Sequence, residues 1–411
     1  MNENVCRSSP YNDNFDNSGL IKRAMLWIAS CAGLAAGIEC LRRVAPCLRR
    51  LAMIPIAMIP SDSKDPGALR VGILGAAKIA PAAVVWPASK MTDVVIAAVA
   101  ARDQSKARAF AKAHRIPKVH ASYQALIEDE SIDAVYNPLP NGLHAVWTIK
   151  ALQAGKHVLC EKPFASNAEE AAAVLKVVND TQLVCVEAFH YRFHPAVHRF
   201  HEMIGEVGQV KSVETAFEIP FPFIRHNDIR YDVRGTDRSL AGGSLMDAGC
   251  YAVNCMRYLV GAEPTAVTEA SVVEAFPGVD ESATATFAFA GGITARIRSS
   301  FRARWFNAQA SVHGSEGSLR IFNFLAPFLY HFIELRDSSG RVVRTEKIYG
   351  NGETTYEHQL RAFVGAVRRD PAAAAACESA GSVAESVSNM RVIDMIYQAA
   401  GLARRRGMPL Q

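Results

Sequence analysis

The residues best suited to chemistry are Glu161, Lys162 and Pro163, which directly follow an apolar, β-branched run. If Val158 to Cys160 is a buried parallel strand, Glu161 and Lys162 lie at its carboxyl end, where open α/β sheets bind their ligands. Pro163 cannot continue the strand ladder, and a cis bond before it would fix the direction of Lys162. The alternative is an ordinary strand end with solvated charges.

A second pair of candidate residues is Asp247 and Tyr251, in the stretch that follows Gly242 and Gly243. The glycine pair opens a predicted helix on which the two residues are four apart, so their side chains point the same way. A tyrosine with a pKa of about 10 needs a neighbouring cation to act as an acid or base at neutral pH. We expect Lys162 to hold the reacting oxygen and lower the pKa of Tyr251, with Asp247 orienting both groups. In the alternative, Tyr251 is a core aromatic residue with a bonded hydroxyl.

Three histidines, His190, His194 and His198, repeat at a spacing of four residues. On one helix they would share a face, which is a pattern that can bind a metal. Because no cysteine is near and no acid has a fitting spacing, we predict no metal site. We expect Tyr191 and Arg192 to line a polar pocket near the substrate and the later histidines to lie at the surface.

The elements that must position these residues begin with a predicted strand, Leu69 to Leu74. It leads into a variant of the G-x-G-x-x-G/A loop with alanine at the second and third positions. A glycine allows the tight turn, small residues let backbone N–H groups approach a pyrophosphate, and the next helix offers its positive end. Pro81 fits the first turn of that helix. The loop residues predicted to bind a cofactor are Gly75, Ala76, Ala77, Lys78 and Ile79.

A second predicted strand, Val94 to Ala101, ends beside Arg102 and Asp103. NAD enzymes usually present an acid to the ribose at this place, whereas a guanidinium can bind a 2′-phosphate. The sequence therefore favours NADP over NAD, which stays an alternative. If Asp103 only caps the predicted helix 105–114, Arg102 is a solvated charge.

The strand–helix alternation continues to about residue 186 and predicts a parallel, doubly wound sheet. The further predicted elements are a strand at 134–136, a helix at 143–154, the strand that ends at Pro163, a helix at 168–178 and a strand at 183–186.

Beyond this region, residues 282–304 alternate as a strand pair does, with Gly291 and Gly292 at the turn. This pattern predicts an antiparallel sheet with one covered face and one basic, hydrated face. Thr294, Arg296, Arg298, Ser300, Arg302 and Arg304 face one way, and Ala295, Ile297, Phe301 and Ala303 face the other. A row of arginines can bind nucleic acid, but acids such as Glu269, Glu274 and Glu281 on neighbouring strands favour a face of paired charges. We expect helices at 354–369 and 382–405, separated by an alanine-rich stretch after Pro371.

The composition limits the class of protein, its partners and its compartment. Half of the 411 residues are hydrophobic and 21% are charged, so the chain can bury a large core. The formal net charge of +5 is small for this length and does not favour a nucleic-acid partner. Nine cysteines without CxxC or zinc spacing indicate reduced thiols in a reducing compartment, and we expect the cytoplasm.

We expect residues 1–66 to form an extension outside the fold. Residues 24–38 are uncharged, but a run of fifteen is shorter than the ~20 apolar residues of a spanning helix. Glu3, Asp13 and Asp16 dilute the basic region that a signal peptide needs. A transit peptide, a surface helix and an over-long reading frame with Met53 or Met58 as the working start are the alternatives. A chain that starts at Met58 should fold and keep full activity.

Four motifs in a fixed order give a family resemblance. They are Gly72-x-x-Gly75-x-Ala77, Pro140-Asn141-x-x-His144, Gly155-Lys156-His157-Val158-x-x-Glu161-Lys162-Pro163 and Glu187-Ala188-Phe189-x-Tyr191-Arg192. Over residues 67–405 the chain resembles the glucose-fructose oxidoreductase / inositol dehydrogenase / rhizopine catabolism (Gfo/Idh/MocA) family. It is most similar to the branch that holds dimeric dihydrodiol dehydrogenase and NADP-linked D-xylose dehydrogenase.

The resemblance implies an α/β fold with a Rossmann domain at 67–190 and an α+β domain at 191–405. The second domain would carry a large, mostly antiparallel open sheet whose free face forms a homodimer interface. The family usually has Asp-x-x-x-His where this chain has Asp247 and Tyr251. The implied cofactor contacts add Pro138, Asn141, His144, Glu161, Lys162 and Arg192, and the implied substrate contacts are Lys162, Tyr191, Asp247 and Tyr251.

The resulting hypothesis is an enzyme that transfers a hydride between NADP and a carbinol carbon of a sugar or diol. It would be of the D-xylose 1-dehydrogenase or trans-dihydrodiol dehydrogenase type. One alternative is a sugar or redox sensor of the same fold, as in a yeast galactose-regulon repressor, although a sensor needs neither Lys162 nor Tyr251. Another is a redox-assisted glycosidase. The substrate itself depends on loops such as 220–234, whose shape the sequence does not give.

Overall fold

The computed structural model describes residues 64–221, 223–224 and 240–410. Residues 1–63 of the predicted extension 1–66, with its apolar run at 24–38 and Met58, lie outside the described residues, as does most of the loop 220–234. Within the described ranges, no helix has the length and apolar character to cross a membrane. The five cysteines in these ranges, Cys160, Cys185, Cys250, Cys255 and Cys377, are buried and free.

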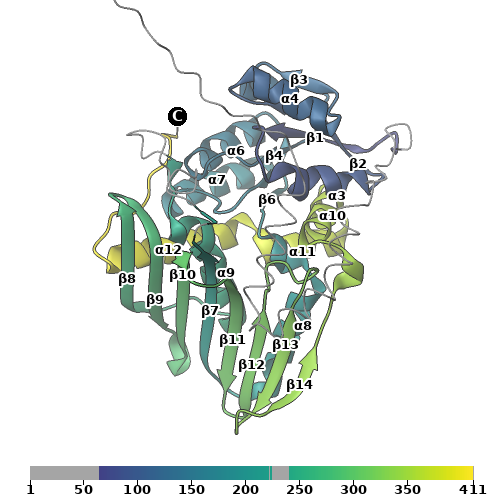
Figure 1. The fold of residues 1–411 in the computed structure, drawn as a ribbon. Coiled ribbons are helices and arrows are strands. Elements are labelled where there is room, and N and C mark those ends of the chain that lie inside the picture. Colours follow the sequence, from purple (N-terminus) through teal and green to yellow (C-terminus); the bar gives the residue numbers. More distant parts are fainter. Residues whose placement is uncertain (1–63, 222, 225–239, 411) are drawn as a thin grey trace, which may run out of the picture. The chain divides into compact units, whose positions relative to one another are not determined.

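The first sheet contains six parallel strands in the order β3-β2-β1-β4-β5-β6 (Figure 1). This is the doubly wound order of a dinucleotide-binding domain and confirms the predicted Rossmann sheet. The strands are β1 (Leu69–Leu74), β2 (Val94–Ala100), β3 (Lys118–His120), β4 (Ala134–Asn137), β5 (His157–Cys160) and β6 (Cys185–Glu187). The short strand β3 and the helix after it had no counterpart in the prediction.

Residues with known capping or first-turn preferences mark the start of several helices of this region. Asp103, Ser122 and Asn167 each cap a helix by accepting backbone N–H groups, and Pro81 occupies a first turn. The helical segments are η2 (Pro81–Val85, a π-helix), α3 (Trp86–Ser89), α4 (Gln104–His114), α5 (Tyr123–Ile127), η3 (Asn141–Leu143), α6 (His144–Gln153) and α7 (Ala168–Thr181).

The second sheet has eight strands in the order β14-β13-β12-β11-β7-β10-β9-β8. All neighbours pair antiparallel except β7 and β10, which are parallel. In β10 the arginines are exposed or half-buried while Ala295, Ile297 and Phe301 are buried, as the alternation predicted. The strands are β7 (Val210–Pro220), β8 (Ala266–Phe276), β9 (Val279–Ala288), β10 (Thr294–Ala303), β11 (Asn307–Gly314), β12 (Gly317–Phe322), β13 (Phe332–Asp337) and β14 (Val342–Glu346).

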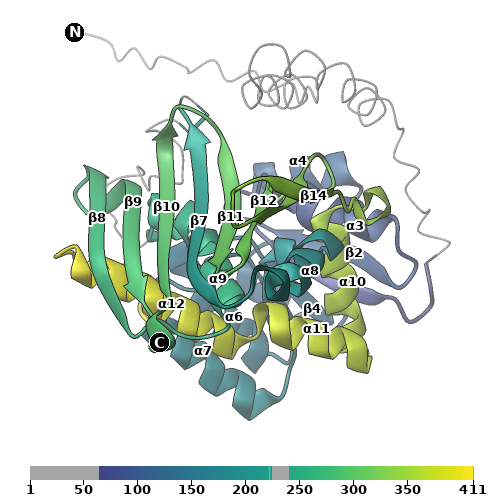
Figure 2. The same cartoon turned by 90° about the horizontal axis from the view of Figure 1, so that it is seen from below.

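Helices α9 and α12 pack on one face of this sheet (Figure 2). The alanine-rich stretch after Pro371 is itself a helix, and α12 ends at Ala399 rather than at residue 405. The predicted dimer through the charged face stays a prediction. The helical segments are η4 (His190–Phe193), α8 (Pro195–Glu202), η5 (Met203–Val207), η8 (Leu245–Gly249, a π-helix), α9 (Cys250–Val260), η9 (Ala290–Gly292), η10 (Gly350–Gly352), α10 (Thr355–Val367), α11 (Pro371–Gly381) and α12 (Val383–Ala399).

Helix α10 joins the core of the Rossmann region although it lies far along the chain. Leu360, Phe363 and Val364 are buried in the same apolar cluster as β1 residues. At the end of α3, Lys90 donates to Glu357 at 2.5 Å. The apolar core therefore does not divide at residue 190, and the predicted domain limits 1–66, 67–190 and 191–405 stay a prediction.

Asp280 in β9 holds the start of η8 in place. Its carboxylate is fully buried and accepts from the Leu245 backbone N–H at 2.6 Å, the Tyr397 hydroxyl at 2.7 Å and the Arg405 guanidinium at 2.8 Å. Gly243 has a φ of +122°, and a Cβ there would lie 2.4 Å from Asp280 Oδ1. Only glycine fits this close approach.

We expect Asp280→Ala to lower the free energy of unfolding by about 3–5 kcal/mol, because it leaves the buried Arg405 charge without its carboxylate. Urea denaturation followed by circular dichroism measures this change. Asp180→Asn is the matched control, since Asp180 is exposed and the change should stay within about 0.5 kcal/mol. Equal effects of the two substitutions would contradict the role given to Asp280.

Candidate active site

The site is built around an ion pair between Lys162, which follows β5, and Asp247 in η8. Lys162 Nζ donates to Asp247 Oδ1 at 2.7 Å and to the Asp247 backbone oxygen at 3.0 Å. The exposed fractions of the two side chains are only 14% and 21%. Burial lowers the pKa of Lys162, but the charges of Asp247 and neighbouring acidic groups outweigh it and hold the pKa above its usual value. The lysine is therefore a cation at neutral pH.

The segment that carries Lys162 is fixed on both sides. Glu161 accepts from the Tyr136 hydroxyl at 2.7 Å, and burial raises the pKa of this carboxyl although Lys162 opposes the shift. The Lys162–Pro163 peptide bond is cis, as the sequence suggested. Farther on, the Phe164 N–H donates to Glu187 at 2.9 Å. Glu161 is thus committed to Tyr136 within the protein, while Lys162 reaches across to η8.

Tyr251 lies next to this pair. Its ring is buried against Phe189 and Phe217, and Lys162 Nζ lies 5.0 Å from the ring centroid. The hydroxyl is 2.9 Å from His190 Nε2. A core tyrosine would also be buried with a bonded hydroxyl. Tyr251 differs from an ordinary core tyrosine in that it lies next to the Lys162–Asp247 ion pair.

The prediction that Tyr251 has a lowered pKa because of Lys162 is wrong for this arrangement. Burial raises the pKa of Tyr251 well above its usual value, and the neighbouring Tyr356 and Glu161 raise it further. Lys162 faces the ring, and its hydrogen bonds go to Asp247 instead of the phenol oxygen. Tyr251 is therefore a protonated phenol in the free protein.

Asp247 and Tyr251 are brought together as predicted, but not on a regular helix. Asp247 lies in the π-helix η8 and Tyr251 in the first turn of α9. Both side chains nevertheless meet Lys162. A π-helical turn within a helix often occurs at functional sites.

Two residues of α10 complete the surroundings of Tyr251, and neither was among the predicted site residues. The Thr355 hydroxyl is 2.7 Å from His190 Nδ1, and the Tyr356 ring lies 4.1 Å from the His190 ring. His190 itself was considered as a metal ligand. No pattern in the sequence connects residues 190 and 355, because α10 reaches the site only through the tertiary fold.

The loop after β1 fits a dinucleotide cofactor. Gly75 has a φ of +99°, and its N–H donates to the Ala100 oxygen at 2.6 Å, which makes the sharp turn expected of this loop. Ala76 and Ala77 are half-buried, and Lys78 and Ile79 are exposed at the carboxyl edge of the sheet. Small residues in a tight turn that leads into a helix are what a pyrophosphate requires.

At the end of β2 the two charged residues have separate roles. Asp103 Oδ1 accepts from the Ser105 N–H at 2.9 Å, the Ser105 hydroxyl at 2.6 Å and the Lys106 N–H at 3.1 Å, so this carboxylate caps α4. Arg102 is exposed beside the half-buried Tyr123 and weakens the burial-driven rise of the Tyr123 pKa. The capping by Asp103 is what the solvated-charge alternative expected, and the exposed Arg102 fits both that alternative and a 2′-phosphate contact, which stays a prediction.

The predicted contacts near residue 140 mainly tie loops together. His144 is buried, with Nδ1 2.7 Å from the Pro163 oxygen and Nε2 2.6 Å from the Leu139 oxygen. Asn141 Nδ2 donates to the Ala241 oxygen at 2.9 Å, next to the glycine pair. Pro138 is half-buried in the same loop. These residues shape the site, and a direct contact of any of them with the cofactor stays a prediction.

Tyr191 does not lie where the sequence suggested. It is fully buried, and its hydroxyl donates to Asn254 Oδ1 at 2.6 Å. The structure therefore places Tyr191 in the core beside Tyr251, and a direct substrate contact is wrong for this arrangement.

Arg192 is also away from the glycine loop. Its guanidinium is 3.5 Å from the Tyr258 ring centroid and donates to the Ser379 oxygen at 2.9 Å. It lines a cavity of about 310 Å³ together with His198 and His201. Its predicted role in cofactor binding therefore has no support from these contacts.

The three histidines do not share a helix face. His190 belongs to η4, whereas His194 caps α8 by accepting the Ala196 N–H at 3.1 Å. His194 is fully buried, so its predicted surface position is wrong, while His198 is exposed. In the described part of the chain, no three His, Cys, Asp or Glu side chains are grouped as metal ligands would be.

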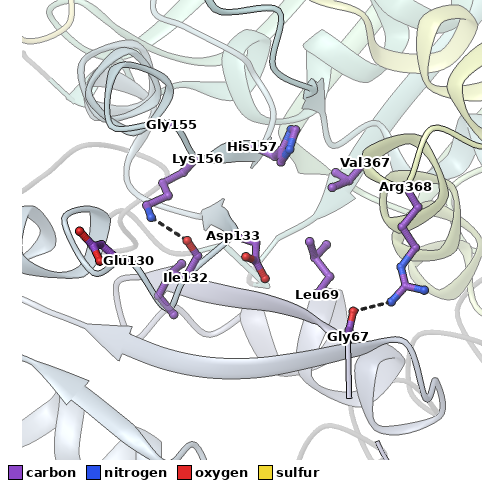
Figure 3. Close-up of a pocket in the computed structure, with 10 residues that line it drawn as sticks. All are labelled: Gly67, Leu69, Glu130, Ile132, Asp133, Gly155, Lys156, His157, Val367 and Arg368. Atoms are coloured by element: carbon purple, nitrogen blue, oxygen red, sulfur yellow. Dashed lines mark hydrogen bonds between the residues drawn. The ribbon is translucent and has the colours of Figure 1, made fainter. Parts of the chain in front are cut away.

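A cavity of about 450 Å³ lies at the opposite edge of the Rossmann sheet (Figure 3). It is lined by Leu69 and His157, the first residues of β1 and β5, and by Asp133, which precedes β4. Beside the cavity, Lys156 donates to the Ile132 backbone oxygen, and Arg368, at the end of α10, donates to the Gly67 backbone oxygen. Because it adjoins the amino ends of the strands, this cavity is not part of the Lys162 site.

Comparison with known proteins agrees with this geometry. Residues 69–189 match the family model described as "Oxidoreductase family, NAD-binding Rossmann fold", and residues 199–320 match the GFO/IDH/MocA C-terminal domain. D-xylose 1-dehydrogenase (NADP(+)) 2 of Haloferax volcanii is 38% identical over 80% of this chain and 96% of its own length. Trans-1,2-dihydrobenzene-1,2-diol dehydrogenase of Xenopus tropicalis is 32% identical over 62% of this chain and 75% of its own.

A solved structure shares the same fold. A 3-ketoreductase from Actinomadura kijaniata, in complex with NADP and TDP-benzene, superposes with a TM-score of 0.68 at 25% identity. The match covers 83% of this chain and 100% of the ketoreductase.

We expect Arg102→Ala to weaken NADP binding about 10–100-fold and to change NAD binding little, because a charge-assisted contact to the 2′-phosphate is worth roughly 1.5–3 kcal/mol. Titration calorimetry with each cofactor measures both affinities. Arg108→Ala, which removes an exposed arginine farther along α4, is the control for a general loss of positive charge. Equal weakening of both cofactors by Arg102→Ala would make Arg102 a solvated charge.

Proposed function

From the premise that the chain belongs to the Gfo/Idh/MocA family of NAD(P)-dependent oxidoreductases, we propose that it oxidises a carbinol carbon of a sugar or diol with NADP. The observation that carries this proposal is the contact of Lys162 with both Asp247 and Tyr251 at the carboxyl edge of the cofactor sheet. The names of the xylose and dihydrodiol dehydrogenase relatives support the same substrate class.

In this proposal NADP, when bound, supplies the acceptor for the hydride that leaves the carbinol carbon. The chain's residues handle the oxygen and its proton. Lys162 holds the reacting oxygen through its ammonium, and Asp247 keeps the lysine charged and directed. Tyr251 takes the hydroxyl proton in oxidation and returns it in reduction. Because burial raises the pKa of Tyr251, the free protein is set to donate a proton, and oxidation should become faster as the pH rises.

A substrate screen tests the proposal. Aldoses, polyols and cyclic trans-diols are offered with NADP, and the absorbance of reduced nicotinamide is followed. Turnover of a free sugar or diol supports a dehydrogenase. Cleavage of a glycoside without net NADPH would indicate a redox-assisted glycosidase, and cofactor binding without any turnover would indicate a sensor. Either outcome would overturn the proposal.

Tyr251→Phe keeps the ring and its packing but removes the proton carrier. We expect turnover to fall by about 10²–10⁴, the range for loss of a general acid or base, with NADP affinity nearly unchanged. Lys162→Met should be at least as damaging. The double variant should be little worse than the poorer single one, because the two residues act as one unit.

Steady-state kinetics and cofactor titration provide these values. Tyr258→Phe is the matched control, since it removes a phenol hydroxyl two turns farther along α9 and should keep full turnover. Wild-type turnover in Tyr251→Phe would make Tyr251 a core residue. Normal turnover in both the Tyr251 and the Lys162 variant would exclude the oxidoreductase mechanism.

A further inference from the structure

His190 is the polar neighbour of the Tyr251 hydroxyl. Its Nε2 lies 2.9 Å from Tyr251 Oη, and its Nδ1 lies 2.7 Å from Thr355 Oγ1. The imidazole is 94% buried, since only 6% of its surface is exposed, and its ring packs on Tyr356. Both ring nitrogens are therefore committed, one to the proposed acid/base and one to a hydroxyl of α10.

A neutral histidine ring carries its one proton on either Nδ1 or Nε2, and both partners here are hydroxyls. Burial, together with the charge of Lys162, lowers the pKa of His190 to about 3, so the ring is neutral and has one N–H. A donor–acceptor distance of 2.7 Å is typical of a hydroxyl donor, whereas 2.9 Å is typical of an N–H donor. The distances of 2.7 Å to Thr355 Oγ1 and 2.9 Å to Tyr251 Oη fit the form in which the Thr355 hydroxyl donates to Nδ1 and the Nε2–H donates to Tyr251 Oη.

This arrangement determines what Tyr251 can do. In this form the Tyr251 oxygen accepts from His190, so the phenol proton is free for another acceptor, and a substrate oxygen is the acceptor that the site requires. Lys162 cannot provide this orientation, since it faces the ring and donates to Asp247.

We propose that His190, held in the Nε2–H tautomer by Thr355, is the positioning residue that directs the Tyr251 proton at the substrate and stabilises the phenolate. The proposal rests on the proposed function of Tyr251 as the acid/base. In reduction, Tyr251 gives its proton to the substrate oxygen while the carbon receives the hydride. The phenolate that remains accepts the Nε2–H bond. In oxidation the same proton returns to the phenolate, so that His190 keeps its own proton throughout.

The tautomer can be measured without any substrate. Protein labelled with ¹⁵N-histidine is compared with the His190→Gln variant to assign the His190 resonances by NMR. We expect a protonated Nε2 and an unprotonated Nδ1 between pH 6 and 8. Thr355→Val, which removes the hydroxyl donor with little change in shape, should let the other tautomer appear. A protonated Nδ1 in the unmodified protein would overturn the proposal even if a substrate is turned over.

Kinetics tests the effect on Tyr251. In His190→Phe, kcat should fall about 10–100-fold, with KM and NADP affinity changed less than about threefold. The rise of the oxidation rate with pH should move upward by about 1–2 pH units, because a hydrogen bond to the phenolate is lost. His190→Gln retains a side-chain N–H donor and should recover most of the rate and of the profile.

The pH profile must be assigned to the right group. The titratable and charged groups that face Tyr251 are Lys162, Glu161, Asp247, Cys250, Tyr136, Tyr191, Tyr356 and His190. Of these groups, only His190 is changed in the variants compared. A shift of the pH profile that His190→Phe causes and His190→Gln reverses is therefore due to the lost N–H donor.

His313→Gln is the control, since His313 is exposed on β11 and should leave the rate and the profile unchanged. Equal losses in His190→Phe and His190→Gln, with no movement of the profile, would reduce His190 to a packing residue and overturn the proposal. If no sugar or diol is turned over at all, the proposed function fails, and the NMR result still decides the tautomer.

Discussion

The buried ion pair between Lys162 and Asp247 is the interaction on which the rest of the site depends. It joins the carboxyl end of β5 in the first sheet to η8 beside the second, at 2.7 Å. Removing one partner of a fully buried pair costs about 3–5 kcal/mol, because the other charge is left without compensation, and the cost should be somewhat lower here, where 14% and 21% of the side chains are exposed. Lys162 also donates to the Asp247 backbone oxygen, so the lysine holds both the side chain of Asp247 and the backbone of the π-helical turn.

The surrounding structure holds both ends of this pair. On the side of β5, Tyr136 binds Glu161, and His144 bonds to the carbonyl of Pro163. On the side of η8, Asp280 receives the Leu245 N–H and is itself bound by Arg405. The two sides therefore present Lys162 and Asp247 to each other with little freedom.

The C-terminal segment after α12 connects the same regions. The Arg405 oxygen accepts from Asn167 at 2.9 Å, and the Met408 N–H donates to the Gly142 oxygen at 2.8 Å. One short segment thus contacts α7, the loop at η3 and, through the Arg405 side chain, Asp280 in β9. The ends of the described chain contribute directly to the support of the site.

The sequence predicted those features that depend on local pattern. The turn at Gly75, the strand end at Lys162 and the alternation in β10 follow from residue size, charge and period, and the structure contains all three. That Asp247 orients Lys162 and Tyr251 was predicted from the position of each residue on its element, whereas the direct ion pair between Lys162 and Asp247 was not predicted.

Other features depend on tertiary contacts and were missed. Thr355 reaches His190 across 165 residues, and no local pattern marks it. Tyr191 is polar enough to line a pocket, but its hydroxyl donates a hydrogen bond to Asn254 in the core instead. The π-helical turn at η8 is a matter of backbone hydrogen bonding that the spacing of Asp247 and Tyr251 does not reveal.

A double-mutant cycle on the Lys162–Asp247 pair tests the central claim most directly. Lys162→Met and Asp247→Leu, alone and together, are compared by urea denaturation and by turnover. Each single change should cost about 2–4 kcal/mol of stability, the double variant should cost at least ~1.5 kcal/mol less than their sum, and all three should lose turnover alike. Additive stability losses within about 0.5 kcal/mol, or a double variant that turns over normally, would show that the pair neither joins the two regions nor carries the chemistry.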